Sequence, residues 1–254
     1  MPEVDIKKLF EAGVHFGHKT SRWNPKMASF IHSKRDDSHV INLETTVEQL
    51  EEALPFITEI VGKGRQILFV GTKKQAREIV KSAAESVSMP YVSERWLGGM
   101  LTNQAVTSLQ IKKLKLLEKR MTSGELANRY NKLEVQRFQE EIDSLNVKFG
   151  GVKDMKGKPG AVFVTDAVAD QNAVKEAIKL NIPVIAICDT NADPTGIKFV
   201  IPANDDAIAS LQVITDYVVA AVKAGESVSA KKTQDAKLVE AKPTAMAGGK
   251  SEEK

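Results

Sequence analysis

The sequence has one cysteine, no long hydrophobic run and no large excess of either charge. Cys188 lies in the apolar run from Ile182 to Cys188, so it forms no intrachain disulfide and indicates a buried thiol in a reducing compartment. No stretch reaches the roughly 18 uncharged apolar residues that a membrane helix needs, and the first residues lack the apolar core of a signal peptide. We therefore expect a cytoplasmic protein without a membrane partner.

Charge and length bound the class of protein only loosely. The 254 residues include 36 Lys and Arg and 33 Asp and Glu, which gives a formal net charge of +3. Such a small excess does not by itself establish nucleic-acid binding. The hydrophobic content of 42% supports one sizeable core, and at roughly 150 residues per domain the length allows a second, smaller module.

Short apolar runs alternate with amphipathic stretches on both sides of the middle of the chain. Continuously apolar strands separated by helices indicate a parallel sheet with helices on both faces, which is an α/β fold. The predicted strands are 67–70, 91–92, 161–164, 183–187 and 198–201, and residues 30–31 are expected to pair with 39–41. The predicted helices are 5–12, 47–61, 74–87, 172–180 and 206–223.

Residues 104–149 differ from the rest because they contain no proline, one glycine and no strand-like alternation. Apolar residues recur at steps of three and four in both halves, and Thr122 to Gly124 supplies a turn between them. We therefore predict an inserted α-helical hairpin with coiled-coil-like packing. The globular α/β domain then comprises 1–103 and 150–225. Residues 226–254 lose apolar periodicity and are predicted to be a disordered tail.

The loop from His15 to Lys26 mixes imidazoles, cations and amides with aromatic side chains. Lys and Arg neutralise phosphates, Asn and Ser donate hydrogen bonds, and an aromatic ring covers a base or ribose. The alternative is structural: Phe16 and Trp23 fill the core while His15 and His18 bind buried loop amides. The candidate RNA contacts in this loop are His15, His18, Lys19, Arg22, Trp23, Asn24 and Lys26.

A second basic group follows the first strong strand. Lys73, Lys74 and Arg77 stand at the expected start of a helix, whose free amides and adjacent cations would bind phosphate. The sequence leaves open whether that phosphate belongs to RNA or to a nucleotide. No phosphate-loop motif is present, so nucleotide chemistry has little support.

The predicted root of the hairpin carries paired glycines. Gly98-Gly99 enters it and Gly150-Gly151 leaves it, and glycine tolerates bends that side chains obstruct. The neighbouring Arg95 and Trp96 offer a cation and an aromatic ring, with which RNA or the globular domain would fix the bend. Asn103, at the same root, is a further candidate RNA contact.

Carboxylates follow the last predicted strands, at the edge where ligand-binding loops of an open α/β sheet gather. Asp189 and Asp205, together with His18, form a candidate site for a structural divalent cation, because carboxylates repel one another unless a cation or a donor intervenes. The alternative is turn formation and helix capping. A nucleophile with an adjacent base is not evident, and a Gly-x-Ser-x-Gly elbow is absent, so we expect no enzyme and no required cofactor.

Four patterns occur in order over residues 5 to about 224. They are Leu9 to His18 with Trp23 to Met27; Arg95 to Asn103; Gly150 to Asp166 with Asp170, Val174, Glu176 and Asn181 to Pro183; and Asp189 to Ile208. Together they resemble the family of bacterial small-subunit ribosomal protein two. The resemblance implies a flavodoxin-like α/β domain with an inserted α-helical hairpin.

The function that the resemblance implies is structural. It places the protein on 16S ribosomal RNA at the solvent side of the small subunit, where head meets body, among other small-subunit proteins. It also implies a role in retaining ribosomal protein one, and neither catalysis nor a small-molecule substrate. The hypothesis from another class is a nucleotide- or flavin-binding α/β enzyme that uses the same sheet.

Overall fold

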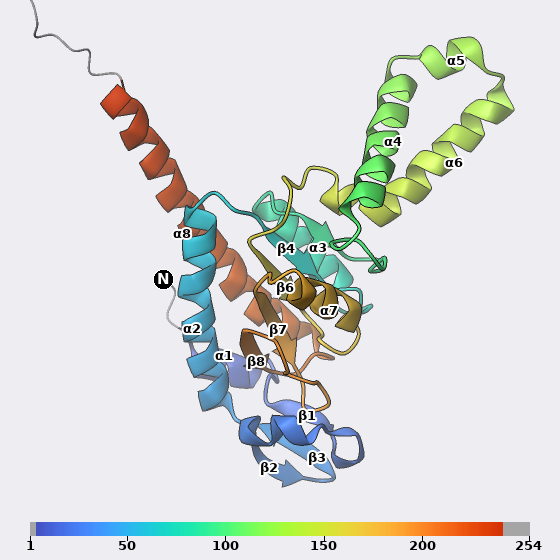
Figure 1. Cartoon of the computed structure of the whole chain (residues 1–254). Helices are drawn as coiled ribbons and strands as arrows, with labels where there is room; N and C mark the ends of the chain where they lie inside the picture. The colour runs from blue at the N-terminus through green and yellow to red at the C-terminus, as the bar shows by residue number, and fades with distance from the viewer. Residues whose placement is uncertain (1–3, 241–254) are drawn as a thin grey trace, which may run out of the picture.

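The computed structural model describes residues 4–240, with side chains described as far as residue 229 (Figure 1). Its centre is a five-stranded parallel sheet in the order β5-β4-β6-β7-β8. Each strand lies within one residue of its predicted bounds. The strands are β4 (Ile67–Val70), β5 (Tyr91–Val92), β6 (Ala161–Val164), β7 (Val184–Cys188) and β8 (Phe199–Pro202).

The strand order identifies the fold. The first strand of this sheet, β4, lies between β5 and β6, so the direction of winding reverses beside it. An open parallel sheet with this order is the flavodoxin-like, doubly wound arrangement. The predicted α/β class and flavodoxin-like sheet are therefore confirmed. In such a sheet, the loops at the carboxyl ends of the strands beside the reversal form the usual ligand site.

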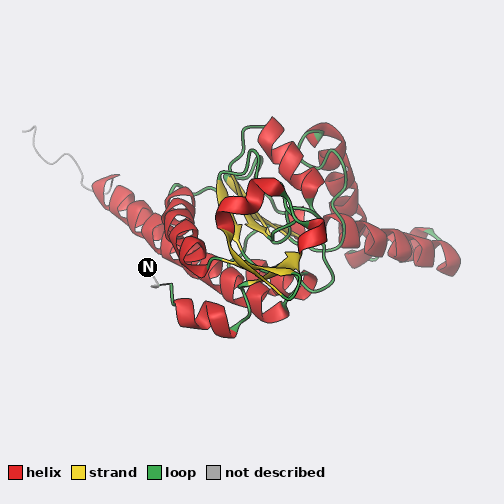
Figure 2. Cartoon of the chain, turned by 90° about the horizontal axis from the view of Figure 1, so that it is seen from below, coloured by secondary structure: helices red, strands yellow, loops and turns green. Residues whose placement is uncertain are grey.

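Helices cover both faces of the sheet (Figure 2). Successive side chains of a strand point to opposite faces, and both faces are apolar here, so both are buried under helices. One face, with Phe69 and Phe163, packs against α1, α2, α3 and α8. The other, with Leu68 and Val162, packs against α7 and the residues that follow β5. These helices are α1 (Ile6–Glu11), α2 (Leu43–Gly62), α3 (Arg77–Ser86), α7 (Gln171–Lys179) and α8 (Ile208–Glu240).

A smaller antiparallel sheet, in the order β1-β3-β2, lies next to the carboxyl end of the main sheet (Figure 1). Its strands are β1 (Phe16–Lys19), β2 (Ile31–Arg35) and β3 (Ser38–Ile41), and 3-10 turns at Thr20–Arg22 and Pro25–Phe30 connect the first two. Ile31 pairs with Ile41, which confirms the predicted strand pair. This small sheet positions β1, and with it the predicted RNA-binding loop.

Three helices form an arm that projects from the domain: α4 (Gln104–Thr122), α5 (Glu125–Arg129) and α6 (Lys132–Phe149). α4 ends at the predicted turn, where Gly124 has a φ of 73°. The apolar spacing of the arm does not predict α5, which is separate from α6 because Asn131 begins α6 with a capping box. The long helices share buried residues such as Leu117 and Leu145 and separate toward α5 (Figure 1). The expected coiled-coil packing is therefore not confirmed.

Helix α8 extends past the predicted end of the globular domain. It packs against α2, and a Cβ added to Gly225 would come within 2.7 Å of Val61. The helix continues to Glu240, which differs from the tail predicted to begin at residue 226; the remainder, 241–254, lies outside the described residues. The stretch Ile208–Ser229 is long and apolar enough to cross a membrane, but more than half of its apolar window is buried inside the protein.

Candidate functional site

The carboxyl ends of three strands bring together the acidic residues that follow them. Asp166 comes after β6, Asp189 directly after β7, and Asp205 and Asp206 after β8. All the strands are parallel, so their following loops meet at one edge of the sheet. Asp166, Asp189 and Asp205 are almost completely buried, whereas Asp206 is exposed. We call these four residues the acidic cluster.

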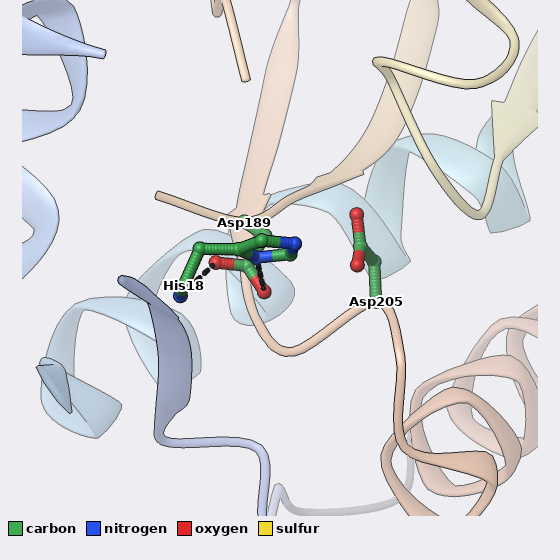
Figure 3. Close-up of side chains that lie close together, drawn as sticks. All are labelled: His18, Asp189 and Asp205. Carbon is green, nitrogen blue, oxygen red and sulfur yellow. Dashed lines mark hydrogen bonds and ion pairs between the residues drawn. The ribbon is translucent and has the colours of Figure 1, made fainter. Parts of the chain in front are cut away.

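His18 reaches the acidic cluster from β1 (Figure 3). Its backbone N–H donates to Asp189 Oδ1 at 3.1 Å and to Thr190 Oγ1 at 3.0 Å, and its ring Nδ1 lies 3.0 Å from Asp189 Oδ2. The hydrogen bond to Asp189 raises the pKa of His18 against the opposing effect of burial. Ligand atoms of His18, Asp189 and Asp205 lie within 4.8 Å of one another, so the three predicted metal ligands are neighbours.

Lys73 points into the acidic cluster instead of outward. Its Nζ lies 2.7 Å from Asp205, 2.8 Å from Asp206 and 3.2 Å from Asp166. Burial lowers the pKa of Lys73, but the hydrogen bonds that it donates to Asp205 and Asp206 outweigh burial and raise the pKa above its usual value. Burial and the charge of Asp166 raise the pKa of Asp205. The cluster thus holds more carboxylates than Lys73 neutralises, and additional positive charge is favourable there.

The crevice beside the winding reversal, where a flavodoxin-like sheet usually binds its ligand, is closed. Thr72 donates to Asp170 through its backbone N–H at 3.1 Å and through its hydroxyl at 2.8 Å. A Cβ added to Gly71 would come within 2.5 Å of Thr165 Oγ1, so the two loops already touch. A nucleotide phosphate would need donors at this point and would meet carboxylates instead.

Helix α3 begins at Arg77 and not at residue 74 as predicted. Arg77 donates from Nε to the Thr72 carbonyl at 3.0 Å and pairs with Glu94 at 2.7 Å. Lys74 precedes the helix and is exposed, with no carboxylate partner among the described side chains. Lys73 and Arg77 thus bind groups within the protein, so Lys74 alone of the three has an unpaired charge within the described part of the chain, and phosphate contact by them stays a prediction.

The loop predicted to bind RNA presents an exposed ring and two unpaired cations. Trp23 is 38% exposed, with its ring 5.1 Å from that of His39. Lys19 and Arg22 are exposed and have no carboxylate partner among residues 4–229. The alternative in which Trp23 fills the core is therefore wrong, and RNA contact by these three side chains stays a prediction.

Two other residues of the loop have structural partners. Lys26 lies 2.9 Å from Asp193 and also donates to Thr195 at 2.8 Å. Asn24 accepts from the Lys26 backbone N–H and begins the turn before β2. An RNA phosphate would have to compete with Asp193 for Lys26, so these positions are weaker candidates than Lys19 and Arg22.

Three rings near the N-terminus form an exposed aromatic surface. His15 stacks on Phe10 with ring centres 4.5 Å apart and lies 4.1 Å from Phe16. Both phenylalanines are more than half exposed, so the alternative in which Phe16 fills the core is also wrong. Burial lowers the pKa of His15, which favours its neutral form. Its ring therefore lies beside both phenylalanines in this surface, and RNA contact by His15 stays a prediction.

One carboxylate on α7 holds the loop from which the arm departs. Glu176 accepts from the Trp96 indole at 3.1 Å and from the Gly99 backbone at 2.7 Å. Its second oxygen accepts from the backbone of Leu101 and from the backbone and hydroxyl of Thr102 at 3.0 to 3.1 Å. Burial acts to raise the pKa of Glu176, but these hydrogen bonds outweigh it and the net pKa is lowered. We call Glu176, residues 96–102 and the pair Gly150-Gly151 after α6 the arm root.

The globular domain holds the bend at the arm root through Glu176. The sequence had left open whether RNA or the globular domain would hold it. Trp96 is buried, so its ring is not available for stacking on a base, which corrects that candidate contact. Asn103 begins α4 by accepting from the Val106 backbone N–H. Arg95 is exposed, and no described carboxylate pairs with it.

Two of the four glycines predicted to shape the root are required there. Gly99 has a φ of 89°, and a Cβ added to Gly151 would come within 2.3 Å of the Tyr91 carbonyl oxygen. Gly98 has open space around it and Gly150 meets only Asn146 at 3.5 Å. The bend therefore depends on one glycine of each pair.

Comparison with known families decides the protein's class. A family model described as Ribosomal protein S2 matches residues 9–225, which include the acidic cluster, the arm and its root. The chain belongs to the ribosomal protein S2 family. It is therefore a structural protein of the small ribosomal subunit that acts in translation in the cytoplasmic ribosome, and it is not an enzyme. The hypothesis of a nucleotide- or flavin-binding enzyme is thereby corrected.

Two residues of this ribosomal protein S2 site were not among the predicted site residues. Asp166 follows its strand much as Asp189 follows the next one, so the same reasoning would have found it. Glu176 belongs to the third family pattern, but it lies within an amphipathic helix, where a glutamate normally faces solvent, so its residue type and spacing predict no contact. Its role depends on a loop that is distant in sequence.

Proposed function

We propose that the protein binds 16S ribosomal RNA on the solvent side of the small subunit, where the head meets the body, and braces RNA segments there. The family match over residues 9–225 carries the proposal. The unpaired cations Lys19 and Arg22 support it because they are available to phosphates, and Trp23 beside them offers a ring to a ribose or base.

Co-sedimentation with small subunits that lack this protein tests the proposal. The wild-type protein should bind one to one. The variant Lys19→Ala, Arg22→Ala, Trp23→Ala should bind on the order of a hundredfold more weakly, since each of the three lost phosphate or stacking contacts costs about 1 kcal/mol or more. The matched control is Lys34→Ala with Arg35→Ala, two exposed cations that already face Asp37 and Asp36. Failure of the wild-type protein to bind would overturn the proposal.

Retention of ribosomal protein one is the second part of the proposed function. The exposed rings of Phe10 and Phe16, joined by His15, support it because a contiguous apolar surface on a soluble protein is typical of a protein contact. We expect Phe10→Ala with Phe16→Ala to leave the binding of the protein to small subunits unchanged and to lower the amount of ribosomal protein one retained. Leu109→Ala, an exposed apolar position on the arm, is the control. Equal retention by both variants would rule out this surface.

A divalent cation at His18, Asp189 and Asp205 is the third part. One imidazole nitrogen and two carboxylate oxygens fit the donor set that Zn²⁺ accepts. A tetrahedral site needs ligand atoms about 3.4 Å apart, whereas these lie within 4.8 Å. Asp205 would therefore move toward His18 and away from Lys73. The ion would supply positive charge to the acidic cluster and tie β1 to the sheet.

Metal analysis and thermal unfolding test this site. With Zn²⁺ at about 100 times its dissociation constant, the free energy of unfolding should rise by about 2.7 kcal/mol. His18→Ala should abolish the effect, whereas His32→Ala, at an exposed histidine on β2, should preserve it. Mg²⁺ serves as the comparison ion, because it prefers oxygen ligands alone. Less than one ion per chain with either metal would exclude the site.

A further inference from the structure

A groove runs along the outer side of β5, between α3 and the base of α6. It consists of three adjoining hollows of about 590, 290 and 550 Å³. The first two share Lys81, Tyr91 and Asn146 as lining residues. The second and third share Glu94, Val147 and Lys148. These shared residues make the hollows one continuous channel, which we call the β5 groove.

Positive charge dominates the β5 groove once its internal pairs are considered. Two of its three carboxylates pair with cations, Glu94 with Arg77 and Asp154 with Lys115, whereas Glu85 accepts from the neutral Tyr91 hydroxyl and keeps its charge. The lining residue Lys153 pairs with Glu118. The remaining cations are Lys81, Arg95 and Lys148, which are exposed and have no carboxylate partner among residues 4–229. Three elements supply them: α3, the loop after β5 and the end of α6.

The position of the groove adds a second argument. Gly151 packs directly against the Tyr91 carbonyl, so the free edge of β5 is covered by the chain itself and does not offer a strand edge to a peptide. What remains accessible is side-chain charge, with Val147 as an exposed apolar residue between the second and third hollows. Unpaired cations spaced along a channel suit a polyanion, and the polyanion of a small ribosomal subunit is RNA.

We propose that the β5 groove is a second RNA-binding surface, in which Lys81, Arg95 and Lys148 contact successive phosphates of one RNA strand. This inference rests on the proposed function and extends it to the side of the domain beside the arm root. Lys81 and Lys148 were not among the RNA contacts predicted from the sequence. Because α3 and α6 form its two walls, the groove places RNA against both the sheet and the arm.

The salt dependence of binding to small subunits lacking this protein tests the groove. The variant Lys81→Gln, Arg95→Gln, Lys148→Gln should bind on the order of tenfold to a hundredfold more weakly near 0.1 M salt. The slope of log affinity against log salt should flatten by about 2, which corresponds to three lost phosphate contacts. The control replaces three exposed lysines outside the groove, as Lys7→Gln, Lys179→Gln, Lys223→Gln, with the same change in net charge. Its slope should equal that of the wild-type protein.

The outcomes separate this inference from the proposed function. If the wild-type protein does not bind, the proposed function fails. If the wild-type protein binds and the groove variant matches the control variant in slope and affinity, the groove inference alone fails.

A photo-crosslinking amino acid at Val147 then identifies the occupant. An adduct with 16S ribosomal RNA in assembled subunits supports the inference. An adduct with another ribosomal protein, or no adduct, overturns it. Val147 is a suitable position because its side chain is exposed and its replacement leaves the core intact.

Discussion

Two carboxylates of this protein, Asp205 in the acidic cluster and Glu176 at the arm root, are held in opposite ways. Asp205 lies among other carboxylates with Lys73 as its charged partner, and burial raises its pKa. Glu176 accepts hydrogen bonds from several uncharged donors around it, and these outweigh burial and lower its pKa. The folded protein therefore resists the ionised form of Asp205 and stabilises that of Glu176.

The acidic cluster and the arm root therefore differ in one respect. The carboxylates of the acidic cluster lack enough positive charge around them, whereas Glu176 has all its hydrogen-bond donors within the protein. Neutral backbone donors fix a carboxylate without requiring anything from outside, which suits the fixed angle of an arm. A cluster with too few cations can take up a proton, a metal ion or a partner's cation, which suits a site that responds to binding. Removing a partner should therefore have different consequences at the two places.

The largest effect should come from Lys73→Met, which removes the positive charge from the acidic cluster. Leaving buried carboxylates without their cation should lower the free energy of unfolding by about 3–5 kcal/mol near neutral pH. Because protonation of a carboxylate with a raised pKa relieves the repulsion, the loss should shrink as the pH falls from 8 to 5. Urea unfolding at both pH values measures it. A loss independent of pH would contradict our account of the cluster.

Glu176→Ala should be nearly as damaging, and neither acid nor metal should rescue it. The change leaves backbone donors of Gly99, Leu101 and Thr102 without their acceptor, at an expected cost of about 2–3 kcal/mol in urea unfolding. Glu51→Ala, at an exposed glutamate of α2, should cost less than about 0.5 kcal/mol. Rescue of Glu176→Ala by Zn²⁺ would erase the distinction between the two sites.

The variants Gly151→Ala and Gly98→Ala test whether close packing or backbone flexibility determines the bend at the arm root. The first change forces a Cβ against the Tyr91 carbonyl and should cost about 1–3 kcal/mol. The second has open space and an ordinary φ, and should change stability by less than about 0.5 kcal/mol. Chemical unfolding of the two variants provides the comparison. Equal losses would mean that packing does not set the bend.

The smallest expected effect is the change in the stability of the arm root as the pH is lowered. Since the folded pKa of Glu176 is lowered, its stabilising contribution is fully present above the unfolded value of about 4.3 and is lost as the pH falls through the folded pKa. The NMR signal of the Trp96 indole N–H should therefore titrate with a midpoint below about 4.3. A midpoint above that value would show that burial outweighs the hydrogen bonds.

The sheet was predictable from the sequence because its strands are short, apolar and separated by amphipathic helices. The meeting of Asp189 and Asp205 was predictable as well, because parallel strands deliver their following residues to one edge. His18 comes from β1 of the antiparallel sheet, so its position beside them does not follow from that rule. The orientation of Lys73 was not predictable, since a cation at a strand end points inward or outward depending on carboxylates far away in sequence. The separate helix α5 was not predictable either, because the capping box at Asn131 that begins α6 lies within a stretch whose apolar spacing resembles one continuous helix.

The pairing of β4 with β6 also has a consequence for how a new chain folds. Ile67 pairs with Ala161, and the whole arm is synthesised between them. Helices with local contacts form far faster than such distant strand pairs, so the arm can fold while β4 still lacks its neighbour. A compact arm brings its two ends together and lowers the entropic cost of closing the sheet. Pulse proteolysis of chains ending at residue 155 should reveal a protected arm on a cleavable domain.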